Sequence, residues 1–139
     1  MRAVIDTVVF VRALINPKGE WGRLLFELSD RYTLVLSPEI IAEILEVIYR
    51  PTVRRKLRRL AAPPRFEAVL SMLEEAEVVE PGEKMSVCRD PDDNKVFECA
   101  VAGAADYIVS EDNDILAVGE CRGTKTISAA EFMRILGTG

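Results

Sequence analysis

Carboxylate side chains recur where predicted strands end, and such positions favour metal-dependent chemistry. The acidic residues concerned are Asp6, Glu43, Asp93 and Asp112, with Asp114 close to the last of them. In an open parallel sheet, ligands collect at the carboxyl ends of the strands, so four separate segments deliver an acid to one edge. Converging carboxylates repel one another unless protons or cations fill the space between them. Oxygen ligands suit hard ions such as Mg²⁺ or Mn²⁺, which activate water and stabilise the charge of phosphodiester displacement.

The composition excludes the imidazole-based alternatives. The chain has 139 residues and contains no His, so Ser-His-Asp and Cys-His hydrolysis and His-ligated zinc are impossible. Cys88, Cys99 and Cys121 are odd in number and lack C-x-x-C spacing, which indicates neither a disulfide framework nor a thiolate zinc site. Cys99 lies in an apolar helical pattern, where we expect a buried, inert thiol. Any catalysis must therefore use carboxylates, hydroxyls, Lys, Tyr or Cys.

Each acid also has a purely structural interpretation. Asp93 and Asp112 could cap helix N-termini, where a carboxylate offsets the helix dipole by about 0.3–1 kcal/mol. Glu43 could be a solvated residue on the polar face of its helix. Asp6 fits such an interpretation less well, because it follows Ala-Val-Ile and precedes Val-Val-Phe-Val beyond Thr7. A buried carboxylate in such surroundings needs a partner, or its pKa rises.

Charge is distributed unevenly along the chain. Seven basic residues and no acidic ones lie between Arg50 and Arg65, whereas the whole chain carries a net charge of −5, so the remainder carries −12. The densest part comprises Arg54, Arg55, Lys56, Arg58 and Arg59. This stretch is interpreted either as a surface that contacts RNA phosphates or as a solvated helix that keeps the protein soluble. It contains no aromatic residue to stack on bases, so it predicts no sequence preference.

Strands and helices are predicted to alternate along the chain. The predicted strands are Arg2–Asp6, Tyr32–Leu36, Glu77–Glu80, Tyr107–Ser110 and Lys125–Ser128. The predicted helices are Glu20–Arg31, Ser37–Arg50, a basic continuation from Pro51 to Ala62, Arg65–Glu75, Asp92–Ala104, Asp112–Val118 and a closing helix capped by Ser128. This alternation predicts an α/β sandwich with a mainly parallel sheet, and residues 1–139 as one domain.

No membrane span or signal peptide is expected. The longest apolar stretch near the N-terminus, Ala3–Ile15, is interrupted by Asp6 and Arg12. A membrane helix needs about 20 apolar residues, and a signal peptide needs a basic start and an unbroken apolar run. The sequence therefore predicts a soluble, cytoplasmic protein.

Four ordered segments give the chain a family resemblance. They are Val4-Ile5-Asp6-Thr7, Ser37-Pro38-Glu39-Ile40-Ile41-Ala42-Glu43-Ile44, Asp90-Pro91-Asp92-Asp93-Asn94-Lys95-Val96 and the stretch from Ala105 to Leu116. In this order the chain resembles the PIN-domain family, particularly the prokaryotic VapC-like toxins. The resemblance implies a three-layer α/β/α fold and metal-dependent cleavage of RNA, with Mg²⁺ or Mn²⁺ as cofactor. It further implies a homodimer and an antitoxin partner.

The resemblance also assigns roles to residues. It implies that Asp6, Glu43, Asp93 and Asp112 form an acidic quartet, with Asp114 as an accessory acid. Thr7 and Ser110 would be polar neighbours that orient ligands or the attacking water. The family usually has Asn two residues after its first Asp, where this chain has Val8. Loss of an outer-shell polar group commonly costs about 10–100-fold in metal affinity or rate.

These observations leave three hypotheses. The first is an Mg²⁺- or Mn²⁺-dependent endoribonuclease of the PIN toxin type. The second, motivated by Val8, is a PIN-fold module of weak or no activity that binds RNA or an antitoxin without cleavage. The third is a phosphatase or phosphoacceptor domain with Asp6 as nucleophile, although Thr7 and Val8 do not fit the D-x-D-x-T pattern of such enzymes.

Overall fold

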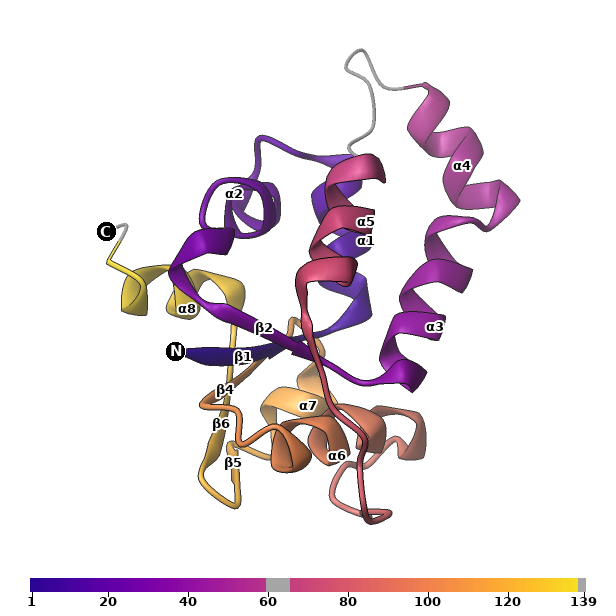
Figure 1. The fold of residues 1–139 in the computed structure, drawn as a ribbon. Coiled ribbons are helices and arrows are strands. Elements are labelled where there is room, and N and C mark those ends of the chain that lie inside the picture. Colours follow the sequence, from indigo (N-terminus) through magenta and orange to yellow (C-terminus); the bar gives the residue numbers. More distant parts are fainter. Residues whose placement is uncertain (60–65, 138–139) are drawn as a thin grey trace.

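The computed structural model describes residues 1–59 and 66–137, and within them a six-stranded sheet has the order β3-β2-β1-β4-β6-β5 (Figure 1). The strands are β1 (Arg2–Ile5), β2 (Thr33–Leu36), β3 (Glu77–Val78), β4 (Tyr107–Val109), β5 (Glu120–Cys121) and β6 (Thr124–Ile127). All neighbours pair in parallel except β5 and β6, which are antiparallel. The predicted, mainly parallel α/β sheet is therefore confirmed.

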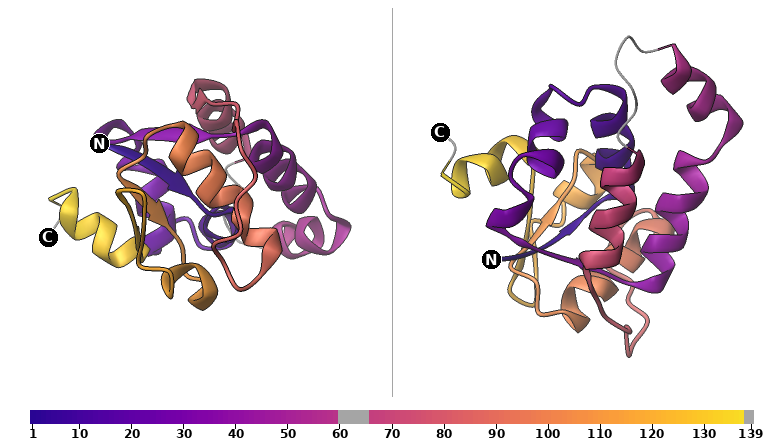
Figure 2. Two further views of the ribbon diagram at one scale, coloured as in Figure 1. Left: turned by 90° about the horizontal axis from the view of Figure 1, so that it is seen from below. Right: turned by 45° about the horizontal axis from the view of Figure 1, so that its top comes forward.

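Eight helices flank the sheet in the described part of the chain. They are α1 (Thr7–Ile15), α2 (Glu20–Phe26), α3 (Pro38–Ile48), α4 (Pro51–Arg58), α5 (Phe66–Glu75), α6 (Asn94–Ala102), α7 (Asn113–Leu116) and α8 (Ala129–Ile135). Two 3₁₀ turns, η1 (Ser29–Arg31) and η2 (Pro91–Asp93), complete the set. In Figure 1, α6 lies below β1 and β2 while α1 and α2 lie above them, and Figure 2 shows the same layers from two other sides. The fold is thus a three-layer α/β/α sandwich.

The central strands are apolar on both faces because helices cover both faces. Ala3, Val4 and Ile5 of β1 are fully buried, as are Ile108 and Val109 of β4. On opposite sides of the sheet, α1 contributes a buried face of Val9, Phe10, Ala13 and Leu14, and α6 contributes Val96, Phe97, Cys99 and Ala100. Cys99 is fully buried, as predicted, and burial raises the pKa of its thiol to about 12.

Strands β1, β2 and β4 end close together, so the residues directly after these strands are gathered at one edge of the sheet. Ile5 pairs with Val109, and the backbone N–H of Asp6 donates to the carbonyl of Val109 at 3.0 Å. Strand β2 is followed by Ser37, whose hydroxyl accepts from the N–H of Ile40 at 3.3 Å and caps α3. With Pro38 at the first helical position, this is the predicted helix start.

The structure corrects two predictions in the first third of the chain. No element was predicted after Asp6, but Thr7–Ile15 is helix α1, because its apolar residues fall at helical spacing on one buried face. The predicted helix Glu20–Arg31 ends at Phe26 and is followed by η1. The hydroxyl of buried Tyr32 donates to the carbonyl of Leu24 at 3.0 Å, which holds the chain back against the last turn of α2 before it enters β2.

Further corrections concern the ends of elements and one missed strand. The predicted helix Asp92–Ala104 begins as the 3₁₀ turn η2, and its α-helical part ends at Ala102, because Ala104 adopts a positive φ of 48°. The predicted strand Glu77–Glu80 is only two residues long, and β5 was not predicted. The stretch predicted to continue to Ala62 and the helix start at Arg65 fall on residues outside the described ranges.

None of the helices formed by residues 1–59 and 66–137 combines the length and the apolar character needed to cross a lipid bilayer.

Gly22 of α2 provides a test of how tightly the chain packs. A Cβ atom on Gly22 would lie 1.9 Å from the backbone oxygen of Pro17, whereas a Cβ on exposed Gly82 would meet nothing within 4 Å. We expect Gly22→Ala to lower the free energy of unfolding by about 1–3 kcal/mol in urea titrations. Gly82→Ala is the matched control and should change little. Equal stability of the two variants would contradict this packing.

Candidate metal centre

Two segments meet through one buried serine at the carboxyl ends of β1 and β4. Ser110 is fully buried, and its hydroxyl donates to Asp6 Oδ2 at 3.0 Å. The same hydroxyl accepts from the backbone N–H of Asp112 at 3.0 Å. Ser110 therefore holds the Asp6 carboxylate in place and fixes where the chain carrying Asp112 leaves β4.

A second set of carboxylates lies beside this serine. One oxygen each from Asp93, Asp112 and Asp114 all lie within 4.8 Å of one another. Asp112 is exposed, whereas Asp93 and Asp114 are half-buried. These side chains come from η2 and from the start of α7, which are separated by more than the length of α6 in the sequence. The fold alone brings them together.

Electrostatic coupling shows that the two sets form one cluster. Burial raises the pKa of Asp6, and nearby Glu43 and Asp112 raise it further, against the effect of the Ser110 hydrogen bond. The pKa of Asp93 is raised to about 6, by burial first and then by Asp112, Asp90, Asp6 and Asp114. Because neighbouring carboxylates act on both Asp6 and Asp93, the cluster favours a bound proton or cation.

Glu43 joins this cluster from α3 and has a partner of its own. Its Oε2 atom forms an ion pair with the ammonium of Lys95 on α6, and the side chains are 30% and 20% exposed respectively. Glu43 also raises the pKa of Asp6, which places its charge close to that carboxylate. The structure therefore brings all five predicted acids to one region, with Glu43 tied to Lys95.

The purely structural roles considered for the acids, as helix caps or solvated residues, hold for some of them and not for others. Asp112 does cap a helix, because its Oδ1 accepts from the backbone N–H of Asp114 at 2.7 Å. Asp93 makes no side-chain cap, since Asp90 accepts the capping hydrogen bond from Asp92 N instead, at 3.0 Å. Asp112 can cap and face the cluster at once because a carboxylate has two oxygens. Glu43 is not the freely solvated residue of the alternative interpretation.

The polar residues after Asp6 take different positions. Thr7 is buried in the first turn of α1, and its backbone N–H hydrogen-bonds the carboxylate of Asp6. Val8 has 44% of its surface exposed. A side chain at position 8 thus points to solvent rather than into the core.

Sequence reasoning missed three residues that support the acids. The Asn94 side chain is buried, and its Oδ1 accepts from the backbone N–H groups of Val87 and Cys88 at 3.0 and 2.8 Å. The Cys88 thiol in turn contacts Asp93 Oδ2 at 4.0 Å. Lys95 had a visible signal, since it is the only Lys or Arg between Asp90 and Cys121.

The densest part of the basic stretch, from Arg54 to Arg59, lies on helix α4 and its C-cap, after α3. Arg55, Lys56, Arg58 and Arg59 are exposed. Arg54 is half-buried, and its guanidinium lies over the rings of Tyr49 and Phe66, with centroid distances of 5.4 and 5.6 Å. A hollow of about 310 Å³ on this helix is lined by Thr52, Arg55, Lys56 and Arg59.

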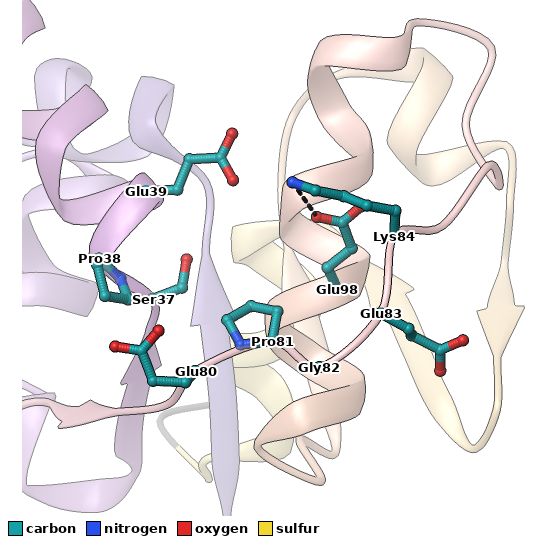
Figure 3. Close-up of a pocket in the computed structure, with 9 residues that line it drawn as sticks. All are labelled: Ser37, Pro38, Glu39, Glu80, Pro81, Gly82, Glu83, Lys84 and Glu98. Atoms are coloured by element: carbon teal, nitrogen blue, oxygen red, sulfur yellow. Dashed lines mark ion pairs between the residues drawn. The ribbon is translucent and has the colours of Figure 1, made fainter.

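A separate hollow of about 290 Å³ opens beside the start of α3 (Figure 3). Glu39, Glu80, Glu83 and Glu98 line it, and Lys84 pairs with Glu98 across 3.9 Å. Figure 3 shows Glu39 on α3 facing Lys84 and Glu98 across the opening. None of the five clustered acids lines this hollow, so it is distinct from the metal centre.

The donor set of the cluster fits a hard divalent cation. It consists of carboxylate oxygens, without imidazole. Burial first, and the neighbouring carboxylates after it, raise the pKa of Asp6 and of Asp93, and a cation held by these oxygens would offset the charge of both. Magnesium and manganese prefer such all-oxygen sites.

Comparisons with known proteins identify the family and the fold. The profile described as PIN domain matches residues 2–114. The uncharacterized protein MJ1680 of Methanocaldococcus jannaschii is 32% identical over 123 residues, covering 85% of this chain and 75% of that protein. The crystal structure of VapBC2 from Rickettsia felis bound to a DNA fragment from their promoter matches with a TM-score of 0.57. That match covers 92% of this chain and 98% of the other at 14% identity, so it shows the fold alone.

Acidification is predicted to stabilise the metal-free protein. The Asp93 pKa of about 6 exceeds the value near 3.9 of an unfolded Asp, so the folded state binds more protons between these values. Stability should therefore rise as the pH falls from 7 to 5, in urea titrations with EDTA. Asp93→Asn should flatten this dependence and should be more stable than wild type at pH 7. Exposed Asp92 provides the control Asp92→Asn, and equal pH profiles for the two variants would contradict the prediction.

Proposed function

This chain belongs to the PIN-domain family, and from that premise we propose that it is a metal-dependent endoribonuclease and the toxin of a toxin–antitoxin pair. The observation that carries the proposal is the convergence of Asp6, Asp93, Asp112 and Asp114 at one edge of the sheet. Nucleases of this kind need closely spaced oxygen ligands and no imidazole. We further propose that residues 1–139 act as one domain.

Each acid has a proposed part in holding the cation. Asp6, Glu43, Asp93 and Asp112 would be the principal ligands, and Asp114 would be accessory. Ser110 would keep the Asp6 carboxylate in one orientation through its 3.0 Å hydrogen bond. Thr7 would add its backbone N–H on the same carboxylate. Residues that orient ligands in this way commonly affect metal affinity or rate by about 10–100-fold.

The proposed reaction is in-line hydrolysis of an RNA phosphodiester. A bound Mg²⁺ or Mn²⁺ would supply charge neutralisation at the phosphate and a lowered pKa of water. The carboxylates would hold a water molecule in line with the scissile bond and accept its proton. Water would attack the phosphorus atom and the bond from phosphorus to the 3′-oxygen would break, which would leave a 5′-phosphate and a 3′-hydroxyl.

Basic residues on α4 are proposed to bind the RNA backbone. Arg55, Lys56, Arg58 and Arg59 are exposed, and three of them line the hollow of about 310 Å³. Arg54 would contribute its charge from its position over Tyr49 and Phe66. Phosphate contacts of this kind would offset the repulsion between RNA and the acidic remainder of the chain.

The toxin role, an antitoxin partner, a homodimer and a cytoplasmic location form part of the same proposal. Their support is the PIN-domain profile and the likeness of the fold to the Rickettsia felis VapBC2 structure. The second candidate is a PIN-fold module that binds RNA or an antitoxin with weak or no cleavage. The exposed Val8, at a position where the family usually has Asn, favours that alternative.

Removing single carboxylates should abolish most cleavage of RNA. We expect Asp6→Asn and Asp93→Asn to lower the rate by about 100-fold or more with Mn²⁺, because each substitution removes a negative charge from the cluster. The measurement is cleavage of a labelled RNA with Mg²⁺ or Mn²⁺ and with EDTA.

Asp30→Asn is the matched control for these variants. Asp30 is an exposed residue of η1, which precedes β2 and so lies at the opposite end of the strands. The Asp30→Asn variant should cleave the labelled RNA at the wild-type rate. Cleavage that persists equally in Asp6→Asn and Asp93→Asn would show a contaminant and remove the nuclease proposal. RNA binding without cleavage by wild type would select the alternative module.

Charge removal on α4 should weaken RNA binding and make it less dependent on salt. For the double variant Lys56→Gln/Arg59→Gln, we expect the slope of log affinity against log salt to fall by about 0.7 for each phosphate of single-stranded RNA that is no longer neutralised. Fluorescence anisotropy with EDTA measures binding without cleavage. The control Lys125→Gln/Arg134→Gln removes the same charges from exposed positions on β6 and α8. Equal slopes for the two double variants would contradict the proposed surface.

A further inference from the structure

Lys95 is the basic residue that reaches the acidic cluster. Among the ion pairs of residues 1–59 and 66–137, only the one between Lys95 and Glu43 involves any of the five clustered acids. Lys95 projects from α6, two residues after Asp93, whereas Glu43 projects from α3. The pair therefore joins two segments that each carry an acid of the cluster.

Because this ion pair is shielded from solvent, losing one partner should cost more free energy than breaking an exposed salt bridge. Both side chains are largely shielded, at 20% exposure for Lys95 and 30% for Glu43. Glu39 and Asp92 also act on the Lys95 ammonium, so acids surround it on several sides. Removal of one partner from a shielded pair leaves an uncompensated charge, which is strongly unfavourable.

The pair also occupies an oxygen atom that a metal would need. The Oε2 atom of Glu43 is shielded from solvent, and its partner is the Lys95 ammonium. The mutually close carboxylate oxygens are those of Asp93, Asp112 and Asp114, and Glu43 is not part of that group. The ammonium of Lys95 therefore engages a carboxylate oxygen of Glu43 that a cation bound by Glu43 would also use.

We infer that Lys95 is a positioning residue that serves as a resident counter-cation for Glu43 and competes with a divalent metal ion for its carboxylate. The inference rests on the proposed function, since the ion concerned is that of the proposed nuclease. In the metal-free protein, Lys95 offsets repulsion between Glu43 and the neighbouring Asp6. Entry of a divalent ion then requires Glu43 to leave or share the ammonium, which weakens metal binding.

Substitution of Lys95 separates this role from a merely structural one. We expect Lys95→Met to lower the thermal midpoint of the EDTA-treated protein by about 5 °C, because Glu43 loses its partner. The same variant should bind Mn²⁺ about 10-fold more tightly than wild type, because the competing ammonium is gone. Calorimetric titration with Mn²⁺ alone measures the affinity.

Two further variants serve as controls. Lys84→Met makes the same charge change, but Lys84 is 87% exposed and pairs with Glu98, so Mn²⁺ affinity should stay at the wild-type value. Glu43→Gln/Lys95→Met replaces the ion pair by two neutral side chains. It should regain much of the lost thermal midpoint and should not show the tighter Mn²⁺ binding of Lys95→Met. Lys95→Gln keeps the test valid if Lys95→Met does not fold, because it also removes the ammonium while its amide can still hydrogen-bond Glu43, and it should likewise bind Mn²⁺ more tightly than wild type.

The outcome that overturns the inference is Mn²⁺ binding by Lys95→Met that equals or falls below that of wild type. Such a result would show that Lys95 orients Glu43 for the metal or has no effect on it. Because no RNA is present in the titration, the result is independent of cleavage. Mn²⁺ binding by a wild-type protein that cuts no RNA would count against the proposed nuclease and leave the inference about Lys95 standing.

Discussion

Repulsion between carboxylates at the carboxyl edge of the sheet is the constraint on which the rest of this structure depends. Asp6, Asp112 and Asp114 each raise the pKa of another member of the cluster. Bringing them together costs folding free energy unless protons, hydrogen bonds or cations offset it. The strongly apolar core of β1, β4, α1 and α6 must therefore stabilise the fold enough to hold an unfavourable cluster at its edge.

The same side chains that form the cluster also organise the local backbone. Ser110 joins Asp6 to the backbone of Asp112, and Asp112 caps the short helix α7. On the other side, Asn94 holds the loop at Val87 and Cys88, and so fixes the approach to η2. Apart from the exposed cap by Asp112, these hydrogen bonds involve buried or part-buried groups, and they hold the acids in place in the metal-free structure.

The basic side chains of this acidic protein lie in two different environments. Lys95 is shielded, paired with Glu43 and surrounded by further acids. The basic residues of α4 are instead largely exposed and form no ion pair with any residue of 1–59 or 66–137, whereas Arg50 just before this helix pairs with Glu46. A shielded ammonium acts on its immediate neighbours, whereas exposed basic side chains act on a charged polymer over a distance set by salt. Lys95 is therefore placed to act on the acidic cluster. The described basic residues of α4 are instead placed to act on a charged polymer such as a nucleic-acid backbone.

The sequence by itself determined the residue types and the order of most elements. The absence of His, the acids at strand ends and the Ser37-Pro38 helix start all arise from local chemistry, which a pattern records directly. It also indicated that a buried Asp6 would need a partner or have a raised pKa, since the flanking residues are apolar, and the structure shows both. Helix α1 was not predicted, because an apolar, β-branched run suits a strand as well as a helix until packing selects one.

Only the tertiary structure decided which side chains meet. The pairing of Lys95 with Glu43 and the link from Ser110 to Asp6 join residues far apart in the chain. Sequence patterns report spacing within one element, but these contacts depend on how α3, α6, β1 and β4 are placed relative to one another. That placement results from the order of the strands and from the burial of apolar faces, which no single segment encodes.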